Sequence, residues 1–187
     1  MEVLKLVQTQ GLNPTELKIN SPLILKDLLK KNIDYGYIKG YGKPSLLKSG
    51  AEKLKMVYGL SIKSLDCINE IFDIENKIID VTYKCVLVNC EGETVGISDG
   101  NANSEEPKFK YRFRKSNMKP SYESAEKLKK EGKGKWGMLN GNWFWYDKIL
   151  NPDILGLKNI IKKIAQKRAF VGAVLMATCT SDLFSQE

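Results

Sequence analysis

The segment PKFKYRFRKS, residues 107–116, alternates cations with aromatic rings. Successive side chains of an extended strand point to opposite faces, so one face of a strand here would carry four cations and the other three rings. Like charges in a row repel one another unless a polyanion lies against them, and the planar arginine fork suits phosphate. The sequence therefore predicts a phosphate-binding strand face. The cations are Lys108, Lys110, Arg112 and Arg114, and the rings are Phe109, Tyr111 and Phe113.

Two simpler roles for this segment stay open. Cations also keep an exposed edge strand from pairing with other strands. The rings are expected to pack in the core against the long C-terminal helix. We therefore expect the rings to anchor the strand and the cations to face outward, toward a sugar–phosphate backbone.

The composition supports an anionic partner and removes several enzyme classes. Lys plus Arg is 30 and Asp plus Glu is 22, which gives a net charge of +8, and the stretch from Lys108 to Lys119 holds six cations and no acid. The chain has no histidine, and so lacks the commonest general base and zinc ligand. No apolar run reaches membrane-spanning length and no signal-peptide pattern opens the chain, so we expect a soluble cytoplasmic protein without a membrane partner.

Catalytic motifs are missing from the sequence. It contains no GxxxxGK[ST] phosphate loop and no GxSxG elbow, and its cysteines form no CxxC pair. Asp99, Glu105 and Glu106 would be the carboxylates of a metal-dependent nuclease, but their spacing matches no metal loop and a solvated loop is favoured. We expect no enzymatic activity, no cofactor, no metal, and four reduced cysteines: Cys67, Cys85, Cys90 and Cys179.

The elements that would position these residues predict an α+β fold. After a lead-in over residues 1–20, one domain over 21–187 is expected. It is an antiparallel β-meander of three to five strands packed on a long C-terminal helix, with N-terminal helices. Helices are predicted from Ser21-Pro22 and over 45–59, a short one from 121 and the longest over 154–177; strands are predicted over 78–89, 94–100 and 107–116, and a hairpin over 136–149.

The long helix carries a cation within its apolar stripe. Arg168 falls in the middle of that stripe, where a charge is costly unless it is paired or opens to a groove. Lys162, Lys163 and Lys167 flank it. If helix and strand meet, Lys167 and Arg168 would extend the basic face into a groove, which suits a single nucleic-acid strand. The stripe consists of Leu157, Ile161, Ile164, Val171 and Leu175.

Three segments resemble phage single-strand annealing proteins of the Rad-fifty-two-like superfamily. They are GKPSLLKSGAEKLKMVYGL at 42–60, EPKFKYRFR at 106–114, and NPDILGLKNIIKKIAQKRAFVGAVLMATCTSDLFSQE at 151–187, the most specific of the three. The resemblance covers most of residues 34–187 in the same order. Where those relatives have a cysteine-containing turn before the basic strand, this chain reads NANSEEP, which puts any role of that turn in doubt.

The resemblance implies a function as well as a fold. It implies ATP-independent binding of single-stranded DNA and annealing of complementary strands in recombination, by a homo-oligomeric ring or helical filament, with a single-strand-binding protein as a further candidate partner. The residues that it implies for the groove are Lys108, Lys110, Arg112, Arg114, Lys163, Lys167 and Arg168, with Lys43, Lys48 and Lys53 as weaker candidates. The alternative is a phage-type protein that binds RNA or a protein–nucleic acid complex, as an inhibitor or packaging factor.

Overall fold

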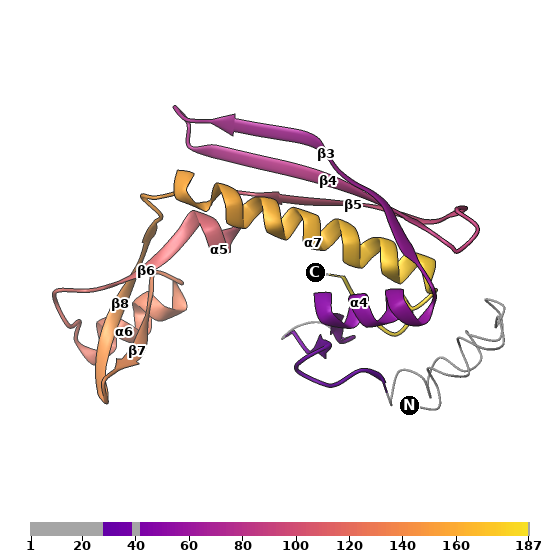
Figure 1. Cartoon of the computed structure of the whole chain (residues 1–187). Coiled ribbons are helices and arrows are strands. Elements are labelled where there is room, and N and C mark those ends of the chain that lie inside the picture. The colour runs from indigo at the N-terminus through magenta and orange to yellow at the C-terminus, as the bar shows by residue number, and fades with distance from the viewer. Residues whose placement is uncertain (1–27, 39–41, 187) are drawn as a thin grey trace. The chain divides into compact units, whose positions relative to one another are not determined.

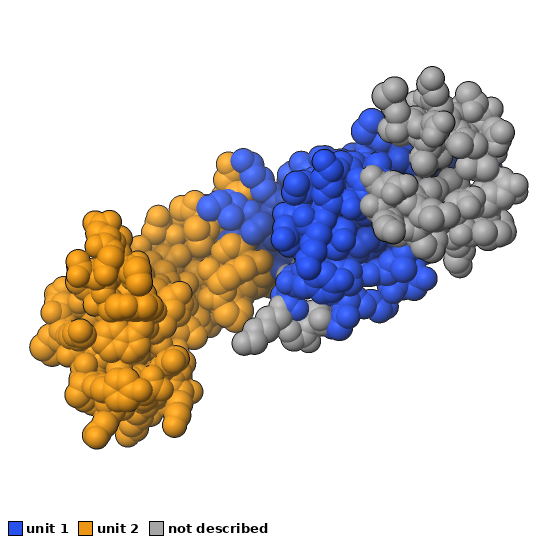
Figure 2. All heavy atoms as spheres, turned by 90° about the horizontal axis from the view of Figure 1, so that it is seen from below, with its two compact units in different colours: residues 1–70, 80–102, 160–187 blue, residues 71–79, 103–159 orange. Residues whose placement is uncertain are grey.

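The computed structural model describes residues 28–38 and 42–186 (Figure 1). Most of the helix predicted from Ser21 therefore lies outside the described residues. The chain forms two compact units, coloured in Figure 2, and each unit is built from segments that alternate along the sequence. Unit 1 comprises residues 1–70, 80–102 and 160–187, and unit 2 comprises residues 71–79 and 103–159. The structure confirms the predicted α+β class.

Unit 1 is organised around a three-stranded sheet and a long helix (Figure 1). The strands lie in the order β3-β4-β5 and the helix is α7. A two-stranded sheet, β1-β2, and the helix α4 also belong to the unit. The bounds are β1 Tyr35–Gly36, β2 Ser45–Leu46, α4 Lys48–Val57, β3 Ser61–Asp73, β4 Ile78–Val88, β5 Thr94–Asn103 and α7 Lys158–Ala177; the end residues of β3, β4, β5 and α7 belong to unit 2.

Glycines let helix α7 approach strand β5 to backbone contact. A Cβ atom at Gly100 would lie 2.2 Å from the backbone nitrogen of Ala169, and one at Gly96 would lie 2.6 Å from the carbonyl oxygen of Ala173. On the helix side, a Cβ at Gly172 would lie 2.3 Å from the Ser98 hydroxyl. A side chain at Gly96 or Gly100 would meet helix backbone and force the helix and sheet apart, so these two glycines fix the depth of packing.

One segment in the second half of α7 is buried on all sides. Residues 169–175 are all buried, as expected for a helix segment that is apolar around its whole circumference. All of them except Gly172 belong to one hydrophobic cluster with Cys85 and Leu87 of β4, Leu54 of α4 and Phe184 of the C-terminal segment. The predicted helix over 154–177 is confirmed, with its first turn formed as a 3₁₀ helix, η1, over Leu155–Leu157.

Unit 2 contains a smaller antiparallel sheet with the order β6-β8-β7. Ser121 caps helix α6 by accepting a hydrogen bond from the Ser124 amide. The Trp145 ring lies against Gly134, and Phe109, Ala125 and Trp145 are buried. The bounds are α5 Pro107–Lys110, β6 Tyr111–Lys115, α6 Tyr122–Lys130, β7 Gly134–Leu139 and β8 Asn142–Leu150.

Two sequence-based expectations about the strands are wrong. The third strand of the meander is β3, over Ser61–Asp73, whereas the basic strand belongs to the β6-β8-β7 sheet. The predicted strand over 107–116 divides into the four-residue helix α5 and the strand β6. Pro107 favours this start, because proline is pre-set for the first turn of a helix and its missing N–H costs nothing there.

All four cysteines are free. Cys85 is buried in the unit 1 core, and burial raises the pKa of its thiol to about 11. Within the described part of the chain, no helix is both long enough and apolar enough to cross a membrane.

Candidate nucleic-acid interface

The strand register of unit 2 assigns each side chain of the β6-β8-β7 sheet to one of two faces. Arg112 lies opposite Ile149 and Arg114 opposite Asp147, while Phe113 lies opposite Lys148. Trp136 lies opposite Trp145. Directly opposed residues share a face, so Arg112 and Arg114 lie on the face of Trp136 and Trp145. Tyr111, Phe113 and Lys115 lie on the other face.

The face of Tyr111 and Phe113 is a mosaic of rings and lysines, which we term the aromatic–lysine face. Three ammonium groups lie over rings: Lys115 at 3.4 Å from the Phe144 ring centroid, Lys135 at 4.1 Å from that of Phe113, and Lys148 at 4.3 Å from that of Tyr111. The ring of a further residue, Tyr146, lies across Gly137. The aromatic–lysine face comprises Tyr111, Phe113, Phe144 and Tyr146 with Lys115, Lys135 and Lys148.

The rings of this face do not form the predicted anchor in the core. Phe113 is 44% exposed, and Tyr111 is half-buried. Only Phe109, which lies in α5, is buried. The expectation that all three rings hold the strand in the core is therefore wrong for Phe113, because the packed side of the sheet is the one that carries Trp145.

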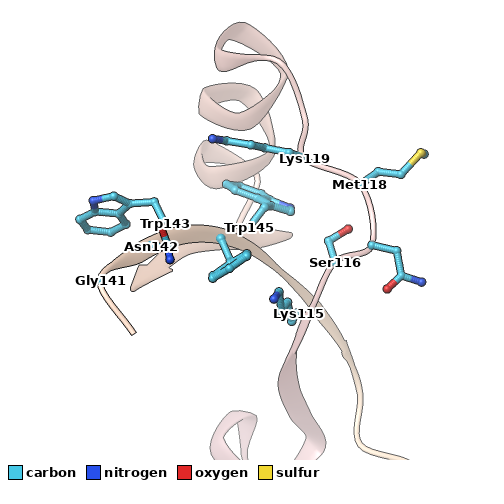
Figure 3. A pocket seen from close by; sticks show the side chains of 10 residues that line it. Lys115, Ser116, Met118, Lys119, Gly141, Asn142, Trp143 and Trp145 are labelled. Carbon is cyan, nitrogen blue, oxygen red and sulfur yellow. The ribbon is translucent and has the colours of Figure 1, made fainter. Parts of the chain in front are cut away.

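The opposite face combines Arg112 and Arg114 with the tryptophans. The Trp145 ring is edge-on to Trp136 at 5.4 Å and its indole N–H donates to Asp147 at 2.9 Å. A hollow of about 970 Å³ opens where the sheet meets residues 116–119. Figure 3 shows Trp145 beside Lys119 and Lys115 beyond the other side of the strand. The Lys119 ammonium lies 5.5 Å from the Trp136 ring centroid.

Lys108 and Lys110 differ in character from the two arginines. Both lie in α5, so the predicted row of four cations along one strand face is wrong; only Arg112 and Arg114 share a face. Lys108 pairs with Glu106 at 3.0 Å and Lys110 pairs with Glu105. The hydrogen bond to Glu105 raises the pKa of Lys110. Glu105 and Glu106, which precede the cationic segment, thus neutralise its first two cations.

The three predicted site cations of helix α7, Lys163, Lys167 and Arg168, lie in unit 1. Lys163 is exposed, and Arg168 donates from its guanidinium to the carbonyl oxygen of Asn101 in β5 at 2.6 Å. That hydrogen bond supplies the partner that a cation within an apolar stripe needs. Because Arg112 and Arg114 lie in unit 2, the groove that would join them to Lys167 and Arg168 stays a prediction.

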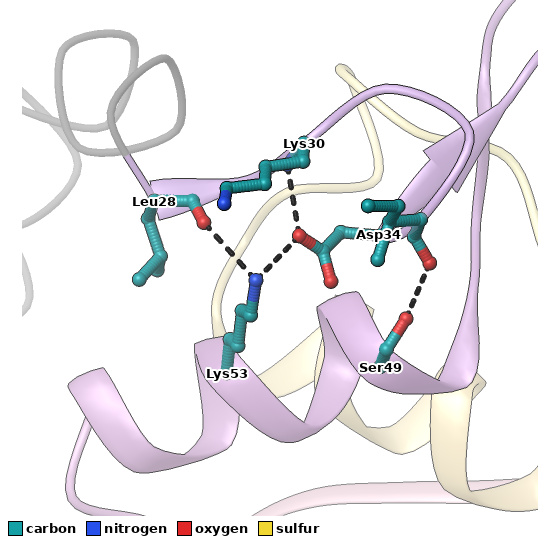
Figure 4. Close-up of polar contacts among 6 residues, drawn as sticks. Leu28, Lys30, Asp34, Ser49 and Lys53 are labelled. Carbon is teal, nitrogen blue, oxygen red and sulfur yellow. Dashed lines mark hydrogen bonds and ion pairs between the residues drawn. The ribbon is translucent and has the colours of Figure 1, made fainter.

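The three weaker candidates already have contacts of their own in unit 1. Lys43 donates to the Ser181 carbonyl at 3.3 Å, and Lys48 pairs with Glu52 at 3.5 Å. Lys53 lies 2.6 Å from the buried carboxylate of Asp34 (Figure 4). This pair is structural, which makes Lys53 the poorest of the three for binding phosphate.

The Asp34 carboxylate also accepts a hydrogen bond from the Lys30 amide at 2.8 Å. Burial alone would raise the pKa of this carboxyl group. The hydrogen bonds and the charge of Lys53 outweigh that effect and hold the pKa below its ordinary value. Asp34 therefore remains ionised at neutral pH inside the fold.

The charge of the β6-β8-β7 sheet is strongly one-sided. Its three strands hold five cations and one acid, Asp147. All five cations are exposed, whereas Asp147 is half-buried and accepts the Trp145 hydrogen bond. The cations are Arg112, Arg114, Lys115, Lys135 and Lys148.

Sequence reasoning found the two arginines but missed Lys115, Lys135 and Lys148. The alternation of NWFWYDKIL, residues 142–150, held the missing signal: its even positions place Phe144, Tyr146 and Lys148 on one strand face.

The carboxylates proposed for a nuclease do not form a metal site. Among residues 28–38 and 42–186, no group of three histidine, cysteine, aspartate or glutamate side chains could hold a metal ion. Glu105 and Glu106 instead pair with lysines of α5.

Comparison with known proteins adds no relative to this chain. No family model, curated protein or solved structure matches this chain.

Proposed function

We propose that this protein binds single-stranded DNA and anneals complementary strands without ATP, as a homo-oligomeric ring or filament in the cytoplasm of a bacterial or phage-infected cell. The observation that carries the proposal is the charge of the β6-β8-β7 sheet, whose two faces together carry five exposed cations and a single half-buried carboxylate. Cations this close together repel one another until a polyanion lies against them. The α+β fold and the sequence resemblance to single-strand annealing proteins favour annealing over other functions of a nucleic-acid-binding protein.

Annealing needs no covalent chemistry. Two complementary strands repel each other through their phosphates, and cations that neutralise those phosphates release counterions and lower the repulsion. Contacts with phosphate carry no base information, so sequence preference should be slight. Several subunits in one assembly would raise the effective concentration of weak sites along the strand. On helix α7 of unit 1, Lys163 and Lys167 are further candidate contacts.

Replacing Arg112 and Arg114 together with alanine should weaken binding of a single strand by at least about tenfold at low salt. The slope of log affinity against log salt should become shallower by about 1.4, because each phosphate contact contributes about 0.7 for single strands. Both side chains are exposed, so the fold should be unaffected. A gel shift over a salt series measures both quantities.

The matched control replaces Lys63 and Lys77 with alanine. Both are exposed, the charge lost is the same, and neither belongs to the candidate interface. An equal loss of affinity in both double variants would show that only net charge matters. Competition with double-stranded DNA and with RNA completes the test, and a preference for RNA would favour the alternative RNA-binding function.

A further inference from the structure

We infer that the aromatic–lysine face of unit 2 is a stacking platform for the bases of a single nucleic-acid strand. This inference rests on the proposed function and adds a second mode of contact to it. Arg112 and Arg114 lie on the other face of the same strand, so the platform is a separate surface from the arginines.

The composition of this face suits both parts of a nucleotide, the base and the phosphate. It offers four rings, of which Phe113 is 44% exposed and the other three are half-buried. Three exposed lysines lie among the rings, and no acidic side chain belongs to this face in the strands β6, β7 and β8. An acidic protein partner would satisfy the lysines alone, whereas a nucleotide satisfies the rings with its base and the lysines with its phosphate.

The lysines that lie over the rings do not prevent stacking. An ammonium group over an exposed ring contributes about 0.5–1 kcal/mol. A base stacked on the same ring contributes about 1–3 kcal/mol. A base therefore displaces Lys135 from Phe113, and the long flexible side chain remains within reach of the phosphate of that nucleotide. The lysine exchanges one favourable contact for another.

Stacking is compatible with annealing, since the two use different parts of a base. A ring contacts the flat face of a base, and pairing with the complementary strand uses its edge. Stacking also tolerates any sequence, because every base has a flat face. A strand held in this way would keep its pairing edges accessible.

The test replaces aromatic rings with leucine, which removes the flat surface for stacking and keeps an apolar side chain. Phe113→Leu alone, and Phe113→Leu with Phe144→Leu, are measured by fluorescence anisotropy against a labelled oligothymidylate and an abasic strand of the same length. We expect affinity for the oligothymidylate to fall roughly tenfold for each ring. Affinity for the abasic strand should be unchanged. Leu139→Ala is the control, because Leu139 is an exposed apolar residue of the same face without a ring.

The outcomes separate this inference from the proposed function. If the wild-type protein binds neither strand, the annealing proposal itself fails. If it binds both strands with equal affinity and the leucine variants bind as the wild type does, the platform is overturned and the phosphate contacts stand. A change of oligomeric state in the Phe113→Leu variant would identify this face as a contact between copies of the chain and would also overturn the inference. Phe113 is exposed, so that single variant should fold even where the double variant does not.

Discussion

Replacing Gly100 with alanine should destabilise the protein by about 3 kcal/mol or more. The new Cβ atom would lie 2.2 Å from the backbone nitrogen of Ala169 and 2.5 Å from the carbonyl oxygen of Ala165. Both neighbours are helix backbone, which cannot rotate away as a side chain would, so the helix must move from the sheet. Overpacking of this kind costs about 1–3 kcal/mol, and a clash with backbone belongs at the top of that range. Thermal unfolding should show a decrease of about 6–12 °C.

Gly36→Ala is the matched control for this prediction. A Cβ atom at Gly36 would meet nothing within 4 Å, and the residue has no positive φ. Its unfolding temperature should stay close to that of the wild type. If Gly100→Ala unfolds at the wild-type temperature as well, the close packing of α7 on β5 is not the arrangement that stabilises unit 1.

Replacing Lys53 with methionine should destabilise the protein by about 2 kcal/mol at neutral pH. The change leaves the Asp34 carboxylate buried without its cationic partner, 2.6 Å away in the native fold. Loss of one partner of a fully buried pair costs about 3–5 kcal/mol, and we reduce this figure because Lys53 is 36% exposed. Chemical denaturation of the variant and the wild type measures the difference.

The pH dependence of this pair has a definite sign. The pKa of Asp34 is held below the ordinary value of 3.8, so the ionised carboxylate stabilises the wild type fully above about pH 4 and this stabilisation fades as the pH falls through the native pKa. The Lys53→Met variant loses the hydrogen bond and the charge of Lys53, both of which lower the pKa of Asp34, so this pKa should be higher in the variant than in the wild type and acid should relieve the unpaired charge. The difference in stability should therefore shrink as the pH falls below about 5.

Lys48→Met provides the comparison on the same helix. Lys48 pairs with Glu52 on the surface, where 63% of the Lys48 side chain is exposed, and its loss should cost less than about 0.5 kcal/mol. A constant difference between Lys53→Met and the wild type from neutral to acid pH would contradict the structural role of the Asp34–Lys53 pair.

The sequence predicted the elements whose residues repeat with a clear period. Helix α7 was predictable because its apolar residues follow the helical repeat after Asn151-Pro152-Asp153. Strand β3 was missed because most of its residues are exposed, so charged and polar residues interrupt any alternation. The helix α5 has four residues, too few for a period to show.

The candidate site was predictable only in its local part. The alternation in the sequence correctly placed Arg112 and Arg114 on one face of a strand. It could not show that Glu105 and Glu106 fold back onto Lys110 and Lys108, since that pairing depends on the turn into α5. Nor could the alternation show which face of the β6-β8-β7 sheet is buried. That depends on the packing around Trp145 and not on the residues of β6.

The most direct test of the central claim follows two complementary labelled strands by fluorescence, in the absence of ATP, with and without the protein. The account predicts that the wild-type protein accelerates duplex formation, that added salt suppresses the acceleration, and that the Arg112→Ala, Arg114→Ala double variant loses most of it. Folded wild-type protein that leaves the rate of pairing unchanged at low salt would contradict the account.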